Sequence, residues 1–236
     1  MKFLRDLADA FSYFSILPVR HADERPADDA IAFLPLVGLI IGGLSGFCGY
    51  GVWLLTHSGL AAAIAAWVLS IALSGAIHVD GFLDCCDGLF AMTSPQRRLE
   101  IMRDPHHGTY AIVGMAVIGV LWLYALVQIP PDMLPAALAF IGCLARWSAI
   151  AEATRRILPG GVLVAVLVVS FHGHWIAALA GIVVAIGVSG VARAFARSRL
   201  AGTHSGDCYG AAIVVTEVAL LLAFPYLVFP YVVLSP

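Results

Sequence analysis

The sequence predicts an all-α fold: a polytopic integral membrane helical bundle of about six or seven transmembrane helices, preceded by an N-terminal interfacial helix. Hydrophobic residues make up 61% of the 236 residues and charged residues only 12%, and the mean hydropathy is +0.94. Because soluble domains carry about 25% charged residues, this chain lacks the polar side chains that would cover a water-facing globule. We expect one membrane-embedded domain over residues 1–236, without a removable signal peptide.

Residues 1–17 predict the interfacial helix. Five apolar side chains recur there at helical spacing: Phe3, Leu4, Leu7, Phe11 and Phe14. A helix with such a stripe buries its apolar face at the boundary between headgroups and acyl chains. The charged loop RHADERPADDA, residues 20–30, then separates this helix from the first span.

Seven apolar stretches follow: 31–56, 60–78, 109–129, 134–154, 161–171, 175–191 and 210–234. A helix needs about 20 residues to span the hydrocarbon, and most of the stretches are long enough. The stretch 161–171 is short by itself. Two interpretations of 161–191 remain open: a tight hairpin that turns at FHGH, or a re-entrant fold.

Charge placement predicts the orientation. Arginines precede the first span, separate the second from the third, follow the fourth and precede the last: Arg5, Arg20, Arg25, Arg97, Arg98, Arg103, Arg155, Arg156, Arg193, Arg197 and Arg199. The hairpin QIPPDMLP has no basic residue. The positive-inside rule then places the N-terminus and residues 79–108 in the cytoplasm and the 130–135 turn outside. Five cysteines without a CxxC pair favour a cytoplasmic (inner) membrane with reduced thiols.

The stretch HVDGFLDCCDGLF, residues 78–90, places three aspartates directly after the second apolar stretch. Asp80, Asp84 and Asp87 are spaced i, i+4, i+7, so on a helix they share one face. Carboxylates this close repel one another unless a cation neutralises them, and oxygen ligands suit Mg²⁺, or alternatively Mn²⁺. We therefore expect these aspartates to be catalytic metal ligands. The alternatives are a solvated loop that binds nothing and, for Asp80, a helix cap.

The segment RRLEIMRDPHHGTYA, residues 97–111, places several charged side chains before the third span. Arginines beside a carboxylate–metal site hold phosphate oxygens in phosphoryl-transfer centres. We therefore expect substrate binding by four residues: Arg97, Arg98, Arg103 and Asp104. The alternative is that the arginines only anchor the topology. His106 and His107 could form a metal or proton-transfer site, although two adjacent histidines are a weak signal.

The segment GTHSGDCYGAAIVVTE, residues 202–217, adds His204 as a candidate substrate ligand and Asp207 and Glu217 as candidate metal ligands. A charged side chain inside a membrane helix is costly and needs a functional or a pairing reason. The alternative role for Glu217 is therefore an ion pair with Arg146 of the fourth span. Arg146 is otherwise a candidate for substrate binding.

Five segments occur together in a recognisable order: FSILPV, FLPLVGLIIG, HVDGFLDCCDGLF, RRLEIMRDPHHGTYA and HSGDCYGAAIVVTE. They resemble cobalamin synthase, the adenosylcobinamide-GDP ribazoletransferase family of membrane enzymes, from about residue 11 to 224. The blocks HxDGxxDxxDG and GDxxGAxxxxxE are specific in combination. The resemblance adds His78 to the three aspartates as a catalytic residue. The chain departs from the family after Arg146, where a longer polar loop is reduced to ATRRILPGG.

The resemblance also implies the reaction. A hydroxyl of α-ribazole, or of its 5'-phosphate, would attack the cobinamide-side phosphorus of adenosylcobinamide-GDP, and GMP would leave. The implied partners are these small molecules and the lipid bilayer, with no nucleic acid, while a homo-oligomer stays open. The residues by themselves lead only to a metal-assisted phosphoryl transfer at the cytoplasmic face of the membrane.

Two other functions fit parts of the pattern. A CDP-alcohol phosphotransferase also uses aspartates on membrane helices, but its DGxxAR block and later aspartate pair are not in register here. A cation or proton transporter would carry carboxylates near the middle of the membrane. Here the acids lie beside an arginine cluster at expected helix ends, which favours an enzyme.

Overall fold

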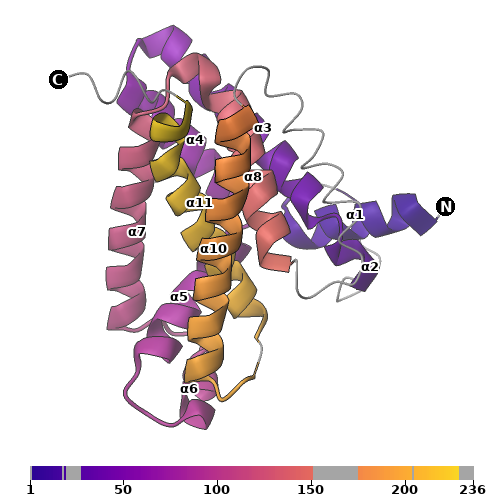
Figure 1. The fold of residues 1–236 in the computed structure, drawn as a ribbon, viewed down its shortest axis with the longest axis vertical. Coiled ribbons are helices and arrows are strands. Elements are labelled where there is room, and N and C mark those ends of the chain that lie inside the picture. Colours follow the sequence, from indigo (N-terminus) through magenta and orange to yellow (C-terminus); the bar gives the residue numbers. More distant parts are fainter. Residues whose placement is uncertain (1, 18, 20–27, 151–174, 204, 229–236) are drawn as a thin grey trace.

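The computed structural model describes residues 2–17, 19, 28–150, 175–203 and 205–228, and these residues are helical with short connections (Figure 1). The helices are α1 (Lys2–Phe14), α2 (Asp28–Ile31), α3 (Leu34–Thr56), α4 (Gly59–Leu73), α5 (Ile77–Phe90), α6 (Pro95–Ile101), α7 (Thr109–Val127), the short η1 (Pro131–Met133), α8 (Leu134–Ile150), α10 (Trp175–Arg199) and α11 (Gly206–Val228). The expected all-α class is confirmed, and the described residues contain no strand.

Within the described residues, five helices are long and apolar enough to cross a membrane, or six if α4 and α5 count as one broken span: Leu34–Thr56, Thr109–Val127, Pro131–Ile150, Ile176–Arg199 and Gly206–Val228. The chain is therefore a multi-pass membrane protein. Its outer surface carries large apolar side chains, such as Val120 on α7 and Val183 and Val191 on α10, each about 70% exposed. The stretch 161–171 and the shortened loop after Arg146 lie outside the described residues.

Glycines bring α3 and α8 into close contact. Gly38, Gly42 and Gly46 recur every four residues on α3, and a Cβ atom on any of them would collide with the backbone of α8. A Cβ atom on Gly142 of α8 would in turn lie 2.6 Å from the carbonyl oxygen of Gly38. Without a hydrophobic drive between helices in lipid, such small-residue contacts hold spans together.

The expected span 60–78 is wrong as one continuous helix. Helix α4 ends at Leu73, Gly75 and Ala76 take φ values of 60° and 58°, and α5 then leaves at 88° to α4. Two consecutive left-handed residues cannot continue a right-handed helix. Residues 79–108, expected to be a loop with helix ends, consequently contain most of α5 and all of α6.

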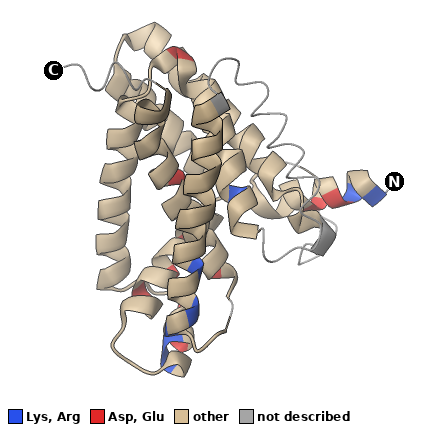
Figure 2. Cartoon of the chain, in the orientation of Figure 1, with Lys and Arg blue, Asp and Glu red and all other residues tan. Residues whose placement is uncertain are grey.

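Two other helix boundaries differ from the predicted ones. Helix α10 continues past residue 191, so Arg193, Arg197 and Arg199 lie on the helix and not in a following loop. Helix α11 begins at Gly206, which puts Asp207 in its first turn. Figure 2 shows that basic residues gather on α6 and the C-terminal part of α10, at the end of the bundle where α7 and α11 begin.

Helix α1 is confirmed as a helix, although it ends at Phe14, three residues earlier than expected. Its Ala10 and Phe11 pack against Val37 and Ile41 of α3. The segment that follows α1 contacts the end of α4, because the backbone N–H of Ile16 donates to the carbonyl of Leu73 at 2.9 Å. The N-terminal segment thus touches the break directly.

Candidate active site

Helix α5 presents the aspartates on one face, as the spacing predicts. The side chain of Asp80 is 65% exposed and that of Asp84 is 16% exposed, while Asp87 is buried. The face therefore runs from open solvent into the protein over two helical turns. Asp80 lies in the first turn of α5 but makes no side-chain capping hydrogen bond, so the cap interpretation is wrong.

A glycine contact brings a fourth carboxylate to this face. A Cβ atom on Gly81 would lie 2.9 Å from the Cα of Asp207, and one on Gly210 would lie 3.3 Å from the Cα of His78. Helices α5 and α11 therefore meet backbone to backbone, and Asp207 enters the electrostatic surroundings of Asp84. The carboxylate of Asp207 accepts a 2.6 Å hydrogen bond from the hydroxyl of Ser205, which orients it.

Asp87 holds the beginning of α7. Its Oδ2 accepts from the backbone N–H of Gly108 at 2.6 Å, and its Oδ1 accepts from that of Ala111 at 3.0 Å. These N–H groups have no partner within the helix, and a carboxylate there also complements the helix dipole. Each oxygen keeps a lone pair, so a metal-ligand role stays a prediction for Asp87 beside this observed contact.

His107 is the residue that sequence reasoning undervalued. Its ring Nε2 lies 3.8 Å from Oδ1 of Asp80, and its Nδ1 lies 3.9 Å from Oδ1 of Asp84. His106 turns away and pairs with Asp104, Nδ1 to Oδ1, at 2.7 Å. Hydrogen bonds from the backbone N–H and then from the ring of His106 lower the pKa of Asp104. Asp104 is thus engaged locally and not by the aspartate face.

The arginines separate into two groups. Arg98 is buried and donates to the carbonyls of Ala91 at 3.1 Å and Arg199 at 2.8 Å, while Arg199 donates to the carbonyl of Leu89 at 2.8 Å. These two side chains satisfy backbone carbonyls at the C-terminal end of α5. Arg97 is exposed and pairs with Glu100 at 2.6 Å. Arg103 is exposed beside the loop that carries His107.

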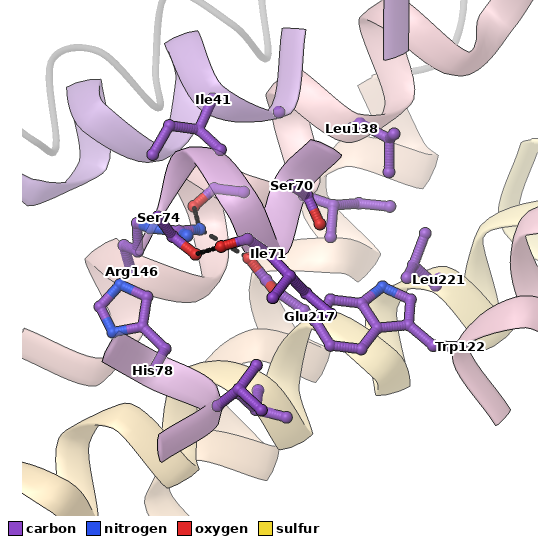
Figure 3. A pocket seen from close by; sticks show the side chains of 15 residues that line it. Ile41, Ser70, Ile71, Ser74, His78, Trp122, Leu138, Arg146, Glu217 and Leu221 are labelled. Atoms are coloured by element: carbon purple, nitrogen blue, oxygen red, sulfur yellow. Dashed lines mark hydrogen bonds and ion pairs between the residues drawn. The ribbon is translucent and has the colours of Figure 1, made fainter. Parts of the chain in front are cut away.

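Three expected site residues lie elsewhere. Arg146 and Glu217 form an ion pair inside the bundle, at 2.5 Å, which confirms the pairing interpretation. Glu217 follows Asp207 by ten residues on one helix, or about 15 Å of rise. His78 is two residues from Asp80, about 200° around α5, and lines the same cavity as the ion pair (Figure 3). His204 lies outside the described residues.

In the part of the chain that the structure describes, the aspartate face offers oxygen donors but no closed metal cage. Among the described residues, no three His, Cys, Asp or Glu side chains converge closely enough to hold a metal ion by themselves. Mg²⁺ does not require such a cage, since it commonly takes one or two carboxylates, several waters and the phosphates of a substrate. Asp80 and Asp84, one helical turn apart and accompanied by Asp207, offer the oxygen donors for that mode of binding.

The fold and this site define a class: a polytopic helical membrane protein with an acidic helix face at the basic end of its bundle and a histidine beside that face. Residues 6–225 match the family described as cobalamin-5-phosphate synthase. The chain belongs to this family, as the sequence resemblance predicts.

Proteins named adenosylcobinamide-GDP ribazoletransferase are similar to the chain over most of its length. The one from Deinococcus radiodurans is 33% identical over 90% of this chain and 82% of its own. That from Desulfitobacterium hafniense is 29% identical over 96% and 99% of the two chains, and that from Thermosynechococcus vestitus is 30% identical over 91% and 93%. No solved structure matches the chain. The CDP-alcohol phosphotransferase and transporter alternatives are not favoured.

Proposed function

We propose that this protein joins adenosylcobinamide-GDP to α-ribazole or its 5'-phosphate and releases GMP, the step named by its relatives. The single observation that carries the proposal is the family membership over residues 6–225. The acidic face of α5 adds a site whose chemistry suits transfer of a phosphoryl group from a diphosphate. In this reaction a ribazole hydroxyl forms a new P–O bond to the cobinamide-side phosphorus, and the bond to GMP breaks.

Asp80 and Asp84 are the side chains best placed to hold Mg²⁺, with Asp207 beside them. When bound, the ion would neutralise charge that builds on the leaving GMP. Arg103 is exposed on the segment that leads to His107, and its planar guanidinium matches the geometry of a phosphate. Asp87 fixes the loop before α7 through Gly108, and this loop carries His107 over Asp80 and Asp84. The protein's own contribution is to position the phosphates and restrict their motion.

The proposal places the protein in the cytoplasmic (inner) membrane with this site facing the cytoplasm. The arginines of α6 and α10 cluster at the site's end of the bundle (Figure 2), and cytoplasmic segments carry an excess of such residues. Adenosylcobinamide-GDP and ribazole would then reach the acidic face from the cytoplasm.

The test is release of GMP by purified protein in liposomes with Mg²⁺, adenosylcobinamide-GDP and α-ribazole. Asp84→Asn removes a charged ligand at nearly constant volume, so turnover should fall by roughly a thousandfold, the several kcal/mol that a metal contact supplies. Asp132→Asn is the matched control, because Asp132 is an exposed acid on η1, in the turn between α7 and α8. Folding of each variant is checked by gel filtration in detergent. An inactive wild type under these conditions would refute the proposed reaction, and a fully active Asp84→Asn variant would refute the metal site.

A further inference from the structure

A small, mostly apolar cavity with several polar side chains in its wall lies inside the bundle, away from the aspartate face. It holds about 40 Å³ and is lined by the Arg146–Glu217 pair, by His78 and by Ser70 and Ser74 from the last turns of α4 (Figure 3). Arg146 is 4% exposed and His78 is 6% exposed. Four helices, α4, α5, α8 and α11, thus contribute polar groups to one buried position.

Two donor or acceptor atoms in this cavity have no protein partner. Within the described part of the chain, Nε2 of His78 and Nε of Arg146 are buried without a hydrogen bond. A buried polar atom that is left unsatisfied is costly. The cavity has room for about three water molecules at roughly 10–15 Å³ each, and His78, Arg146 and the serine hydroxyls offer the partners that such waters need.

The cavity adjoins the α4–α5 break. Ser74, which lines it, is the C-cap residue that follows the last residue of α4. On its other side the His78 ring stacks on Phe14 of α1, with ring centroids 6.1 Å apart. His78 is therefore held between the N-terminal helix and the buried ion pair immediately after the chain changes direction.

His78 is coupled to the aspartates through the helix that they share. His78 precedes Asp80 by two residues on the rigid helix α5, and its backbone is the part of α5 that Gly210 of α11 approaches. Glu217 ties α11 to Arg146 of α8 two turns further along. A displacement of His78 or of Glu217 would therefore shift Asp80 and Asp84 relative to Asp207.

We propose that His78, Arg146 and Glu217 form an intramembrane positioning cluster that fixes the angle between α4 and α5 and so holds the aspartate face against Asp207. The consequence for catalysis rests on the proposed function, whereas the geometric role does not. All three residues line the interior cavity and not the aspartate face. They act through the placement of α5 and α11.

Replacing Arg146 and Glu217 together distinguishes an effect on helix placement from an effect on folding stability. Removing one partner of a buried ion pair leaves an unpaired charge and destabilises the fold, whereas replacing both with apolar residues is often neutral. The double variant Arg146→Met with Glu217→Met should therefore fold while lacking the cluster. Turnover should fall about a hundredfold, because a displacement of about 1 Å at the chemistry has that effect.

Two native cysteines report the geometry without any substrate. The Sγ atoms of Cys85 on α5 and Cys208 on α11 lie 4.0 Å apart. This is a non-bonded contact, so the two sulfurs must approach by about 2 Å to form a disulfide, and the rate of linking depends on how α5 and α11 are placed. Diamide oxidises such a thiol pair to a disulfide and is itself reduced to the hydrazine. Peptide mapping by mass spectrometry measures the rate of this link in each variant, with Gly190→Ala as a control at an α10 site that has open space around it.

The inference is supported if the double variant stays folded, links Cys85 to Cys208 more slowly and loses turnover. It is overturned if that variant links and turns over like the wild type. If the double variant does not fold, substitutions of His78 provide the test. His78→Leu should slow disulfide formation between Cys85 and Cys208. His78→Gln keeps a polar group facing the cavity and should restore the wild-type rate. Equal rates in these two variants would overturn the cluster. If the wild type releases no GMP while His78→Leu still slows the link, the proposed function is refuted and the cluster is retained.

Discussion

Asp87 shows how one side chain can be placed correctly by its spacing and still have an additional role. The i, i+4, i+7 pattern predicts that it shares a face with Asp80 and Asp84, and the helix α5 confirms this. The pattern says nothing of α7, whose first N–H groups occupy both carboxylate oxygens of Asp87. Asp84 and Asp87 therefore differ, although the sequence treats them alike.

Asp87→Asn should destabilise the protein, unlike Asp84→Asn. The amide keeps one acceptor oxygen for the two N–H groups of Gly108 and Ala111, so about 1–2 kcal/mol of stability should be lost. Asp84 accepts no such bond, and neutralising it reduces repulsion within the aspartate face. Thermal unfolding in detergent measures both variants. A melting temperature for Asp87→Asn equal to that of the wild type would show that the observed cap contributes no stability.

Arg103→Lys tests the exposed arginine as a phosphate ligand. The substitution keeps the charge but loses the planar two-pronged donor, so the rate of GMP release should fall while the fold is unchanged. Arg97→Lys is the matched control on the same segment, because Arg97 pairs at the surface with Glu100, and an exposed pair of this kind contributes little. Equal rates for both variants and the wild type would leave Arg103 as a topology anchor only.

At the scale of elements, the glycine contact between α5 and α11 assembles the site. Asp84 and Asp207 lie far apart in the sequence, and no periodicity indicates that they meet. Gly81 and Gly210 make the meeting possible, because a Cβ atom on Gly81 would collide with the backbone of α11 and one on Gly210 would press tightly against that of α5. The sequence contains both glycines in its most specific blocks, yet their function is visible only once the two helices are seen together.

Gly81→Ala should separate α5 from α11 and lower turnover by at least about tenfold, since even small misplacements of catalytic groups are costly. The added Cβ would lie 2.9 Å from the Cα of Asp207 and 3.0 Å from its carbonyl oxygen, and backbone atoms do not move aside easily. Gly190→Ala in α10 meets nothing within 4 Å and serves as the control. Wild-type GMP release by Gly81→Ala would mean that the helix contact does not set the site.

At the scale of the whole molecule, composition and apolar stretches predict the fold class and most spans correctly. The break after Leu73 is different, since Ala76 is an alanine in the left-handed region, where its residue type gives no sign of a turn. His107 is undervalued for another reason, because two adjacent histidines in a loop do not indicate which of them lies beside the aspartates. Local signals predict helices, whereas break angles and contacts between distant segments depend on tertiary packing.

The orientation of the whole bundle has its own test. A cysteine introduced at Ser94, an exposed residue before α6, should be shielded from a membrane-impermeant maleimide in intact spheroplasts. A cysteine at Asp132, beyond α7, should react, because the arginine-rich end is expected to face the cytoplasm. Each variant is also labelled after lysis to show that the thiol is reactive. Equal labelling of both in intact spheroplasts would overturn the topology.

The close glycine contact of α3 with α8 also has a consequence for how the protein is made. Gly38 and Gly142 are about one hundred residues apart in the chain, and a ribosome adds roughly 5–20 residues per second. The glycine face of α3 therefore faces lipid for about 5–20 s before α8 is synthesised. During that interval α3 can pair only with helices already made, such as α4, which packs beside it in the finished protein. During synthesis, pairing of α3 with α8 therefore competes with association of α3 with a neighbouring nascent chain.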